Sequence, residues 1–155
     1  MSEESRQRRS YLSSARTAIT PAASTYSRTK SGHREDLNNL FVRSSWEANY
    51  ARYLNLLIKM KIVESWEYEP ETFWFLEIKC GVRSYKPDFK VKYKNDPKSV
   101  YVEIKGWMDQ KSKTKLARMK KYYPEIKVEL VGQPEYRAIA RQWSNSIPNW
   151  ERGQT

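Results

Sequence analysis

Hydrophobic residues recur along this chain with two different periods, and their alternation predicts a mixed α/β fold. From Ser44 onward, apolar residues return every three or four positions, as on one face of an amphipathic helix. This stripe comprises Trp46, Tyr50, Tyr53, Leu54, Leu57 and Ile58. Residues 62–69 and 72–79 are rich in aromatic and β-branched residues, which favour strands. A Cys80-Gly81 turn leads on to a third strand near Asp88, and together these strands predict an antiparallel meander.

The segment from Tyr85 to Lys105 has the strongest strand signal. Both of its flanks alternate with period two, and residues 94–98 between them are Lys-Asn-Asp-Pro-Lys, which is turn chemistry. The segment therefore predicts an antiparallel hairpin. After it, residues 110–122 predict a basic helix that ends before Pro124, and residues 126–130 predict a strand parallel to the second hairpin strand.

A final helix is predicted to open at Gln133-Pro134, because proline is favoured in the first turn of a helix. Its apolar stripe comprises Tyr136, Ile139, Ala140, Trp143 and Ile147. At the other end of the chain, residues 1–37 are rich in Ser, Arg, Thr and Ala without a sustained period, which is typical of a flexible basic arm. The sequence thus predicts an arm of residues 1–37 followed by one compact domain of residues 38–155.

Three charged side chains are expected to converge on one face of the hairpin. If the turn is centred between Asp96 and Pro97, paired residue numbers sum to about 193, which sets Asp88 opposite Lys105 with Glu103 two residues along. Side chains on opposing strands lie about 5 Å apart at Cβ, so the two carboxylates could bind one hard divalent cation. The alternative is an ordinary solvated face of a hairpin.

The residues at this edge resemble a known nuclease motif. Pro87-Asp88, followed fifteen residues later by Glu103-Ile104-Lys105, resembles the PD-(D/E)xK nuclease superfamily. Two further features strengthen the resemblance. Glu47 ends the segment Arg-Ser-Ser-Trp-Glu at the start of the first helix, and Gly106-Trp107 follows the Glu-x-Lys strand. From residue 41 to residue 131 the chain is similar to the phage endonuclease I family of Holliday-junction resolvases. The Arg-Ser-x-Trp-Glu segment is also similar, more distantly, to head-completion nucleases of tailed phages.

This resemblance implies a restriction-endonuclease-like core, in which a helix, a three-stranded antiparallel meander, a helix and a strand are followed by a C-terminal helix. It also implies a Mg²⁺-dependent DNA endonuclease, with Mn²⁺ able to substitute. Asp88 and Glu103 would ligate the metal, Glu47 would help to hold a second ion, and Lys105 would orient or deprotonate the attacking water. The phage resolvases are intertwined dimers, so a homodimer is expected. Its interface would be filled by Tyr136, Trp143 and Trp150.

Glu47 also has a purely structural interpretation. Ser44 and Glu47 fit a capping box, in which a Glu at the third helical position folds back onto the first turn. The downstream hairpin favours the catalytic interpretation, because a carboxylate in the first helical turn could approach the metal edge. Glu67 matches an acidic position of the resolvase family but equally fits a solvent-facing strand residue, and its role stays open.

The charge balance indicates a polyanionic partner. The 155 residues include 29 Lys and Arg against 18 Asp and Glu, a formal net charge of +11. Such an excess most often indicates nucleic acid, and no basic amphipathic run with an apolar face indicates a membrane anchor. We expect DNA phosphates to be contacted by Arg43 and by Lys111, Lys113 and Lys115 of the basic helix.

Other chemistries are excluded by what the sequence lacks. The single Cys80 rules out an intrachain disulfide, and the lone His33 cannot complete a zinc site with it. No Gly-rich phosphate loop and no recognisable Ser-His arrangement is present, so we expect no organic cofactor. The chain also has no run of 18 apolar residues and no signal-peptide core. We therefore expect a cytoplasmic protein, in the host cytoplasm if a phage encodes it.

Three functions remain open on the sequence. The first is a phage-encoded resolvase that acts on branched DNA, and the second is a head-completion or DNA-trimming nuclease that acts on packaged or linear DNA. The third is a non-catalytic DNA-binding or phage structural protein with a nuclease-like fold. The joint presence of Glu47, Asp88, Glu103 and Lys105 favours an enzyme, because a binding module gains nothing by setting two carboxylates toward a phosphate.

Overall fold

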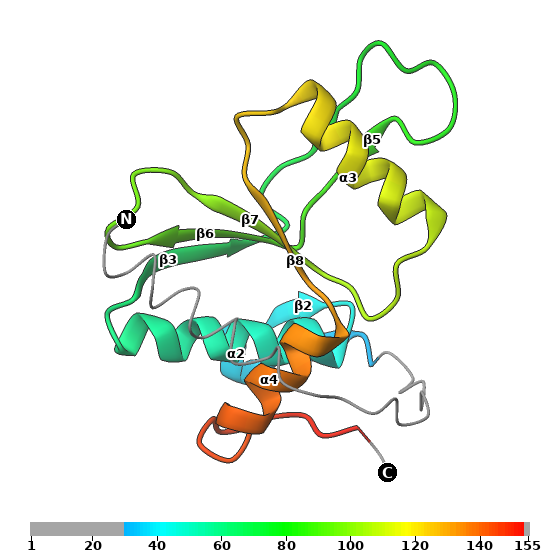
Figure 1. Ribbon diagram of the computed structural model, residues 1–155. Helices are drawn as coiled ribbons and strands as arrows, with labels where there is room; N and C mark the ends of the chain where they lie inside the picture. Colours follow the sequence, from blue (N-terminus) through cyan, green and yellow to red (C-terminus); the bar gives the residue numbers. More distant parts are fainter. Residues whose placement is uncertain (1–29, 154–155) are drawn as a thin grey trace. The chain divides into compact units, whose positions relative to one another are not determined.

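The structure, a computed structural model, describes residues 30–153 and has the predicted mixed α/β composition (Figure 1). Residues 30–56 and 134–153 form one compact unit, here unit 1, and residues 57–133 form a second, unit 2. In chain order the elements are β1 (Gly32–Arg34), the 3-10 helix η2 (Glu35–Leu37), β2 (Leu40–Val42), α2 (Ser45–Lys59), β3 (Val63–Tyr68), β4 (Phe73–Trp74), β5 (Ser84–Tyr85), β6 (Phe89–Tyr93), β7 (Val100–Ile104), α3 (Gln110–Tyr122), β8 (Val128–Val131) and α4 (Gln133–Trp143).

Residues 32–37, which the sequence placed at the end of the arm, are ordered parts of unit 1. β1 pairs antiparallel with β2 and sets His33 opposite Phe41, with the two ring centroids 5.2 Å apart. Asn38 and Asn39, which join η2 to β2, have left-handed backbone angles with φ of 56° and 59°. Asparagine tolerates this conformation better than most residues. Residues 1–29, the rest of the predicted arm, lie outside the described residues.

Helix α2 begins at Ser45, one residue from its predicted start, and runs to Lys59. Its burial is wider than the single apolar stripe that the sequence predicted. Every residue from Glu47 to Leu54 is buried, including the polar Asn49 and Arg52, whereas Ile58 at the end of the stripe is exposed. A buried polar group that lacks a partner costs about 1–3 kcal/mol, so Asn49 and Arg52 must be satisfied within the fold.

Their partners form a cluster that we call the arginine network, defined as Arg34, Asp36, Asn49, Arg52 and Glu151. Arg52 donates to both oxygens of Asp36 at 2.7 and 3.0 Å, and to Glu151 Oε1 at 3.0 Å. Arg34 donates to both oxygens of Glu151 at 2.5 and 3.0 Å. Asn49 donates to the Glu151 carbonyl and accepts from the Glu151 amide, each at 2.8 Å. The network thus ties the C-terminal segment of unit 1 to α2 and β1.

Unit 2 is built on a four-stranded sheet with the order β3-β6-β7-β8. β3, β6 and β7 are antiparallel neighbours, and β8 lies parallel to β7, as the sequence predicted for a strand reached through a helix. Helix α3 begins at the predicted Gln110, where the Asp109 side chain accepts from the Ser112 amide at 2.7 Å. Its buried Met119 belongs to the same hydrophobic cluster as Tyr101 of β7.

The predicted strand of residues 72–79 does not belong to this sheet. Only β4 is extended there, and it pairs with β5 in a separate two-stranded sheet. The rings of Phe73 and Phe75 pack into the hydrophobic cluster around Tyr101, and this burial takes the segment off the ladder, so that β6 pairs directly with β3. Trp74 lies between the two buried rings and is 56% exposed. The meander is therefore formed by β3, β6 and β7.

Candidate functional site

The β6–β7 hairpin forms as predicted, but its register differs from the predicted one by two residues. Phe89 lies opposite Val102, so the next pair beyond the end of the ladder sets Asp88 opposite Glu103. The prediction that Asp88 lies opposite Lys105 is wrong. The correction brings the two carboxylates closer than expected, because direct neighbours across an antiparallel pair lie nearer than diagonal ones.

The register differs because the turn is asymmetric. On the first strand, β6 extends to Tyr93, since its end is held by pairing with Val63 of β3. On the second strand, β7 begins at Val100, which pairs with Val91 and not with Tyr93, and the Asp96 side chain accepts from the Lys98 amide at 3.0 Å in a local turn between the strands. Neither contact is visible from the hairpin sequence alone.

Asp88 and Glu103, which we call the acidic pair, are both half-buried. Asp88 stands directly before β6, and its Oδ2 accepts from the Ile104 amide at 2.7 Å. Its carbonyl accepts from the Glu69 amide at 2.8 Å on the other side. The side chain of Asp88 is therefore directed toward β7, at the residue that directly follows Glu103.

Tyr85 completes this site, and the sequence did not identify it. Its side chain is 1% exposed, and its hydroxyl is buried beside the Glu103 carboxylate. Burial raises the pKa of Tyr85 well above its usual value, and the charges of Glu103 and Asp88 raise it further. Tyr85 and Asp88 are three positions apart, so they share a face only because the chain bends between β5 and β6. An unbroken strand would have separated them.

Lys105 lies at the end of β7, where its amide donates to the Val131 carbonyl at 3.0 Å. Hydrogen bonds from Ser112 lower the pKa of Asp109, and the positive charges of Lys105 and Lys115 lower it further. Lys105 is thus close to the first turn of α3, where the charge of Lys115 acts on the same carboxylate. This end of α3 is a region of positive charge that follows the acidic pair in the chain.

Glu47 forms the capping interactions that were its structural alternative. Its Oε1 accepts from the Ser44 hydroxyl at 2.9 Å, its Oε2 accepts from the Arg43 amide at 3.0 Å, and its own amide donates to Ser44 Oγ at 3.2 Å. Glu47 as a whole is 7% exposed. Both of its oxygens therefore stabilise the start of α2.

The carboxylates fit a metal ion as a pair rather than as a set of three. Among residues 30–153, no three His, Cys, Asp or Glu side chains lie close enough together to hold a metal. Glu47 belongs to unit 1, whereas Asp88 and Glu103 belong to unit 2. A pair still suits Mg²⁺, which commonly takes one or two carboxylates and keeps water or phosphate oxygens as its other ligands.

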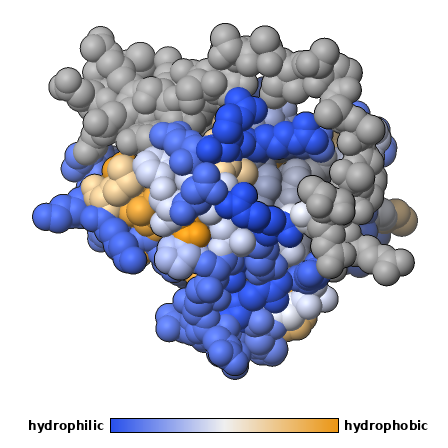
Figure 2. Space-filling model, turned by 90° about the horizontal axis from the view of Figure 1, so that it is seen from below, coloured by the Kyte–Doolittle hydropathy of each residue, from blue (hydrophilic) through white to orange (hydrophobic). Residues whose placement is uncertain are grey.

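The remaining predicted site residues lie on the surface. Glu67 is exposed on β3 opposite Lys90, as expected of a solvent-facing strand residue. Lys111 and Lys113 on α3 are exposed, Lys115 is half-exposed, and Arg43 is exposed before α2. On the face that Figure 2 presents, hydrophilic residues cover much of the described surface, and apolar residues form only small patches.

Of the C-terminal aromatic residues expected at a dimer interface, Tyr136 is packed inside unit 1. Tyr136 is buried and stacks on Trp46, with ring centroids 4.0 Å apart and ring planes 6° apart. Trp150 lies on the same tyrosine at 6.0 Å and 29°. Trp143, at the end of α4, is half-buried. For Tyr136 the sequence prediction was wrong, because its main partner Trp46 lies far away in the chain.

Comparison with protein-family models, with curated proteins and with solved structures finds no match to this chain. Within residues 30–153, no helix is long and apolar enough to cross a membrane.

Proposed function

We propose that this chain is a metal-dependent DNA endonuclease of the PD-(D/E)xK type, which hydrolyses phosphodiester bonds. The observation that carries the proposal is the acidic pair. Asp88 stands directly before β6 and lies opposite Glu103 of β7 when the ladder is extended by one pair, and Lys105 directly follows β7. Two carboxylates this close disfavour each other's charge, and a divalent cation relieves that repulsion. We therefore assign the pair as a metal site.

The topology of unit 2 supports the same proposal. An antiparallel β3-β6-β7 meander followed by α3 and a parallel β8 has the order of the restriction-endonuclease-like core that the sequence resemblance implies. Fold alone does not establish activity, so the acidic pair remains the main argument.

Each residue has a distinct task in this proposal. Asp88 and Glu103 would hold Mg²⁺, or Mn²⁺ in its place. Such an ion, when bound, neutralises the phosphoryl oxygens and lowers the pKa of a coordinated water. Lys105 would orient the attacking water or accept its proton, and its charge would stabilise the developing negative charge. The exposed lysines of α3, together with Arg43, would hold the phosphate backbone.

Branched DNA is our preferred substrate within this proposal, because residues 41–131 resemble the phage resolvases. A junction requires two cuts, so we propose a homodimer with one site in each subunit. Unit 2 has exposed apolar side chains that a dimer could cover: Trp74, Leu76 and Trp107 are 56%, 90% and 70% exposed. Packaged or linear DNA, as for a head-completion nuclease, is the alternative substrate.

The cap at Glu47 favours a second candidate function, a non-catalytic DNA-binding protein with a nuclease-like fold. In the nuclease interpretation Glu47 contributes a third carboxylate, yet both of its oxygens accept hydrogen bonds in the first turn of α2. A protein that only binds DNA would keep this cap and the basic surface of α3, and it would not need a metal. The two candidates therefore differ in metal dependence.

A plasmid assay tests the proposal. Supercoiled plasmid should be nicked in Mg²⁺ and left intact in EDTA, and a four-way junction should be cut faster than linear duplex of the same length. Sedimentation of the protein, alone and with the junction, measures the dimer. Binding to DNA without cleavage in Mg²⁺ or Mn²⁺ would reject the nuclease in favour of the second candidate. Efficient junction cleavage by a protein that remains monomeric would reject the dimer alone.

The contacts to phosphate are tested separately. Replacing Lys111, Lys113 and Lys115 with Ser should weaken binding to all DNA ligands about equally and reduce the slope of log K against log salt by about 2.7, since each phosphate contact contributes about 0.9. Replacing Lys79, Lys94 and Lys98, which are exposed in unit 2, removes the same charge and is the control. Equal slopes for the two triple variants would show that α3 does not contact phosphates.

A further inference from the structure

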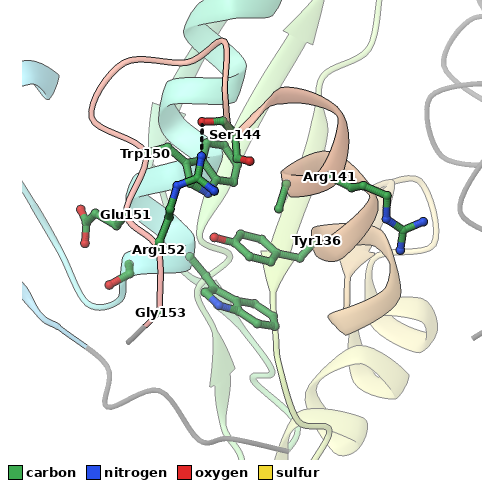
Figure 3. A pocket seen from close by; sticks show the side chains of 10 residues that line it. Tyr136, Arg141, Ser144, Trp150, Glu151, Arg152 and Gly153 are labelled. Carbon is green, nitrogen blue, oxygen red and sulfur yellow. Dashed lines mark hydrogen bonds between the residues drawn. The ribbon is translucent and has the colours of Figure 1, made fainter. Parts of the chain in front are cut away.

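Unit 1 contains a pocket of about 320 Å³ that has no role in the proposed cleavage (Figure 3). Its walls come from the start of α2, from α4 and from the C-terminal segment, and its principal lining residues are Trp46, Tyr136, Arg141, Ser144, Trp150 and Arg152. We call it the aromatic pocket. Its volume lies at the lower end of the range of small-molecule sites, so it suits a ligand of about the size of one nucleotide.

One wall of the pocket is a stack of aromatic rings. Tyr136 lies nearly parallel to Trp46 at 4.0 Å and forms a looser stack with Trp150 at 6.0 Å. Its hydroxyl accepts from Asn49 Nδ2 at 2.7 Å, and burial raises the pKa of Tyr136 to about 12. The tyrosine is therefore fixed and neutral near pH 7. The indoles of Trp46 and Trp150 are only half-buried, and both contribute surface to the pocket.

The pocket is also lined by Arg152, whose guanidinium retains donor capacity. Arg152 is exposed, and one of its nitrogens donates to Asn145 Oδ1 at 2.6 Å and to the Ser144 carbonyl at 3.4 Å. These bonds orient the planar group, which has five N–H donors in all. Figure 3 shows Arg152 beside Ser144, whereas the guanidinium of Arg141 points away from it.

The acidic residue of this pocket does not neutralise Arg152. The carboxylate of Glu151 points away from Arg152 in Figure 3. It is bound by Arg34 and Arg52 in the arginine network, at distances of 2.5 to 3.0 Å. The pocket thus combines an aromatic wall with an oriented cation that is available to an anionic ligand.

We propose that the aromatic pocket binds a nucleotide, with its base against the indoles and its phosphate on Arg152. A base stacked on an aromatic side chain contributes about 1–3 kcal/mol, and a guanidinium matches the geometry of phosphate oxygens. The source of the nucleotide is either a free mononucleotide or one unit of a single DNA strand. DNA is preferred as the polymer because of the proposed function. Binding of a nucleotide follows from the chemistry of the pocket and does not depend on the proposed function.

Titration of the ¹⁵N-labelled full chain with dAMP tests the proposal. The indole N–H signals of Trp46 and Trp150, assigned through Trp→Phe variants, should shift more than those of the other tryptophans. Inorganic phosphate and deoxyribose 5-phosphate, which lack a base, should bind at least about 10-fold more weakly if stacking contributes. An octamer of dA that binds more tightly than dAMP identifies a strand as the ligand, and equal affinities identify a free nucleotide. Shifts confined to other tryptophans would overturn the proposal.

Arg152→Gln supplies the second arm of the test, with Arg137→Gln as its matched control, since both arginines lie in unit 1 and both variants lose one positive charge. Arg152→Gln should weaken dAMP binding about 10-fold, and Arg137→Gln should leave dAMP binding nearly unchanged. Equal affinities in the two variants would reject the site. Plasmid nicking, measured in parallel, keeps the two proposals apart, because Asp88→Asn is expected to lose cleavage and retain dAMP binding. A wild-type protein that binds dAMP without cutting DNA would reject the nuclease alone.

Discussion

Two groups of carboxylates in this molecule are partly covered by protein, and they differ in what surrounds them. In unit 1, Asp36 and Glu151 lie against the guanidinium groups of Arg34 and Arg52. In unit 2, Asp88 accepts a hydrogen bond from a backbone amide, and Glu103 lies beside the hydroxyl of Tyr85. The first group is matched by formal positive charge within the network, whereas the contacts named for the second come from neutral groups.

The pKa values follow this difference. The hydrogen bond from Arg52 lowers the pKa of Asp36. Burial alone would raise the pKa of Glu151, but hydrogen bonds from Arg34, Ser45 and Arg52 outweigh it and hold the pKa below its usual value. In unit 2, burial raises the pKa of Tyr85, and the negative charge of the acidic pair raises it further. The carboxylates of the arginine network therefore stabilise the fold, and the acidic pair produces a negative potential at the hydroxyl of Tyr85.

The largest effect should come from neutralising the acidic pair. Asp88→Asn and Glu103→Gln keep side-chain size and should each reduce Mg²⁺-dependent cleavage by about 100-fold or more, as loss of a group that stabilises transition-state charge usually does. The melting temperature should change little, because each amide fills the same space. Initial rates and thermal melts measure the two effects. Glu64→Gln on β3, where the exposed Glu64 pairs with Lys92, is the control of equal charge, and full activity of either variant would contradict the site.

Breaking the arginine network should have the opposite profile. Arg52→Met leaves Asp36 and Glu151 with fewer partners and should reduce the free energy of unfolding by about 3 kcal/mol, the lower end of the cost of splitting a buried ion pair. For a chain of this size, that corresponds to a fall in melting temperature of about 6–12 °C. Cleavage by the remaining folded protein should persist at low temperature.

Lys92→Met is the control for this change. It breaks an ion pair with Glu64 whose side chains are 45% and 48% exposed, and such surface pairs contribute about 0–1 kcal/mol. Similar melting temperatures for Arg52→Met and Lys92→Met would show that the network is no more than a surface feature.

Acid should destabilise the fold through unit 1. The pKa values of Asp36 and Glu151 are lower in the folded protein than their usual values of 3.8 and 4.5. The unfolded chain therefore binds more protons in this range, so the stabilisation is complete above about pH 5 and is lost as the pH falls through the folded pKa values. Chemical denaturation at several pH values measures this slope. The slope should be smaller in Arg52→Met, and an unchanged slope would show that other groups cause it.

The smallest effect is expected from Tyr85→Phe. This change removes only the hydroxyl beside Glu103, so Glu103, as a proposed metal ligand, loses an orienting partner. The ring of residue 85 keeps its place in the core. Loss of such a partner typically weakens metal binding about 10-fold or more. Cleavage measured against Mg²⁺ concentration should show a higher half-saturation and a similar maximum. Tyr101→Phe, in the same hydrophobic cluster but with its hydroxyl bound to Glu71, is the control; equal effects would indicate a packing role for both rings.

Periodicity in the sequence determined most of the secondary structure. The helices α2, α3 and α4 start within a residue or two of their predicted positions, because apolar spacing, Asp and Ser caps and early prolines act over a few residues. The hairpin and the parallel strand β8 were also predictable, since turn residues and a helical crossover leave few alternatives. Local signals likewise suggested the capping box of Glu47, which the structure contains.

Only the tertiary structure decided which of these residues meet. The pairing of Asp88 with Glu103 depends on how Tyr93 binds β3 and how Asp96 closes its turn, and Tyr85 enters the site through a bend between two strands. Arg52 is buried because its partner Glu151 comes from the far end of the chain. Such contacts join residues distant in sequence, and their stability comes from shared burial. No periodicity encodes that burial, so the sequence determined the elements, and packing determined the sites.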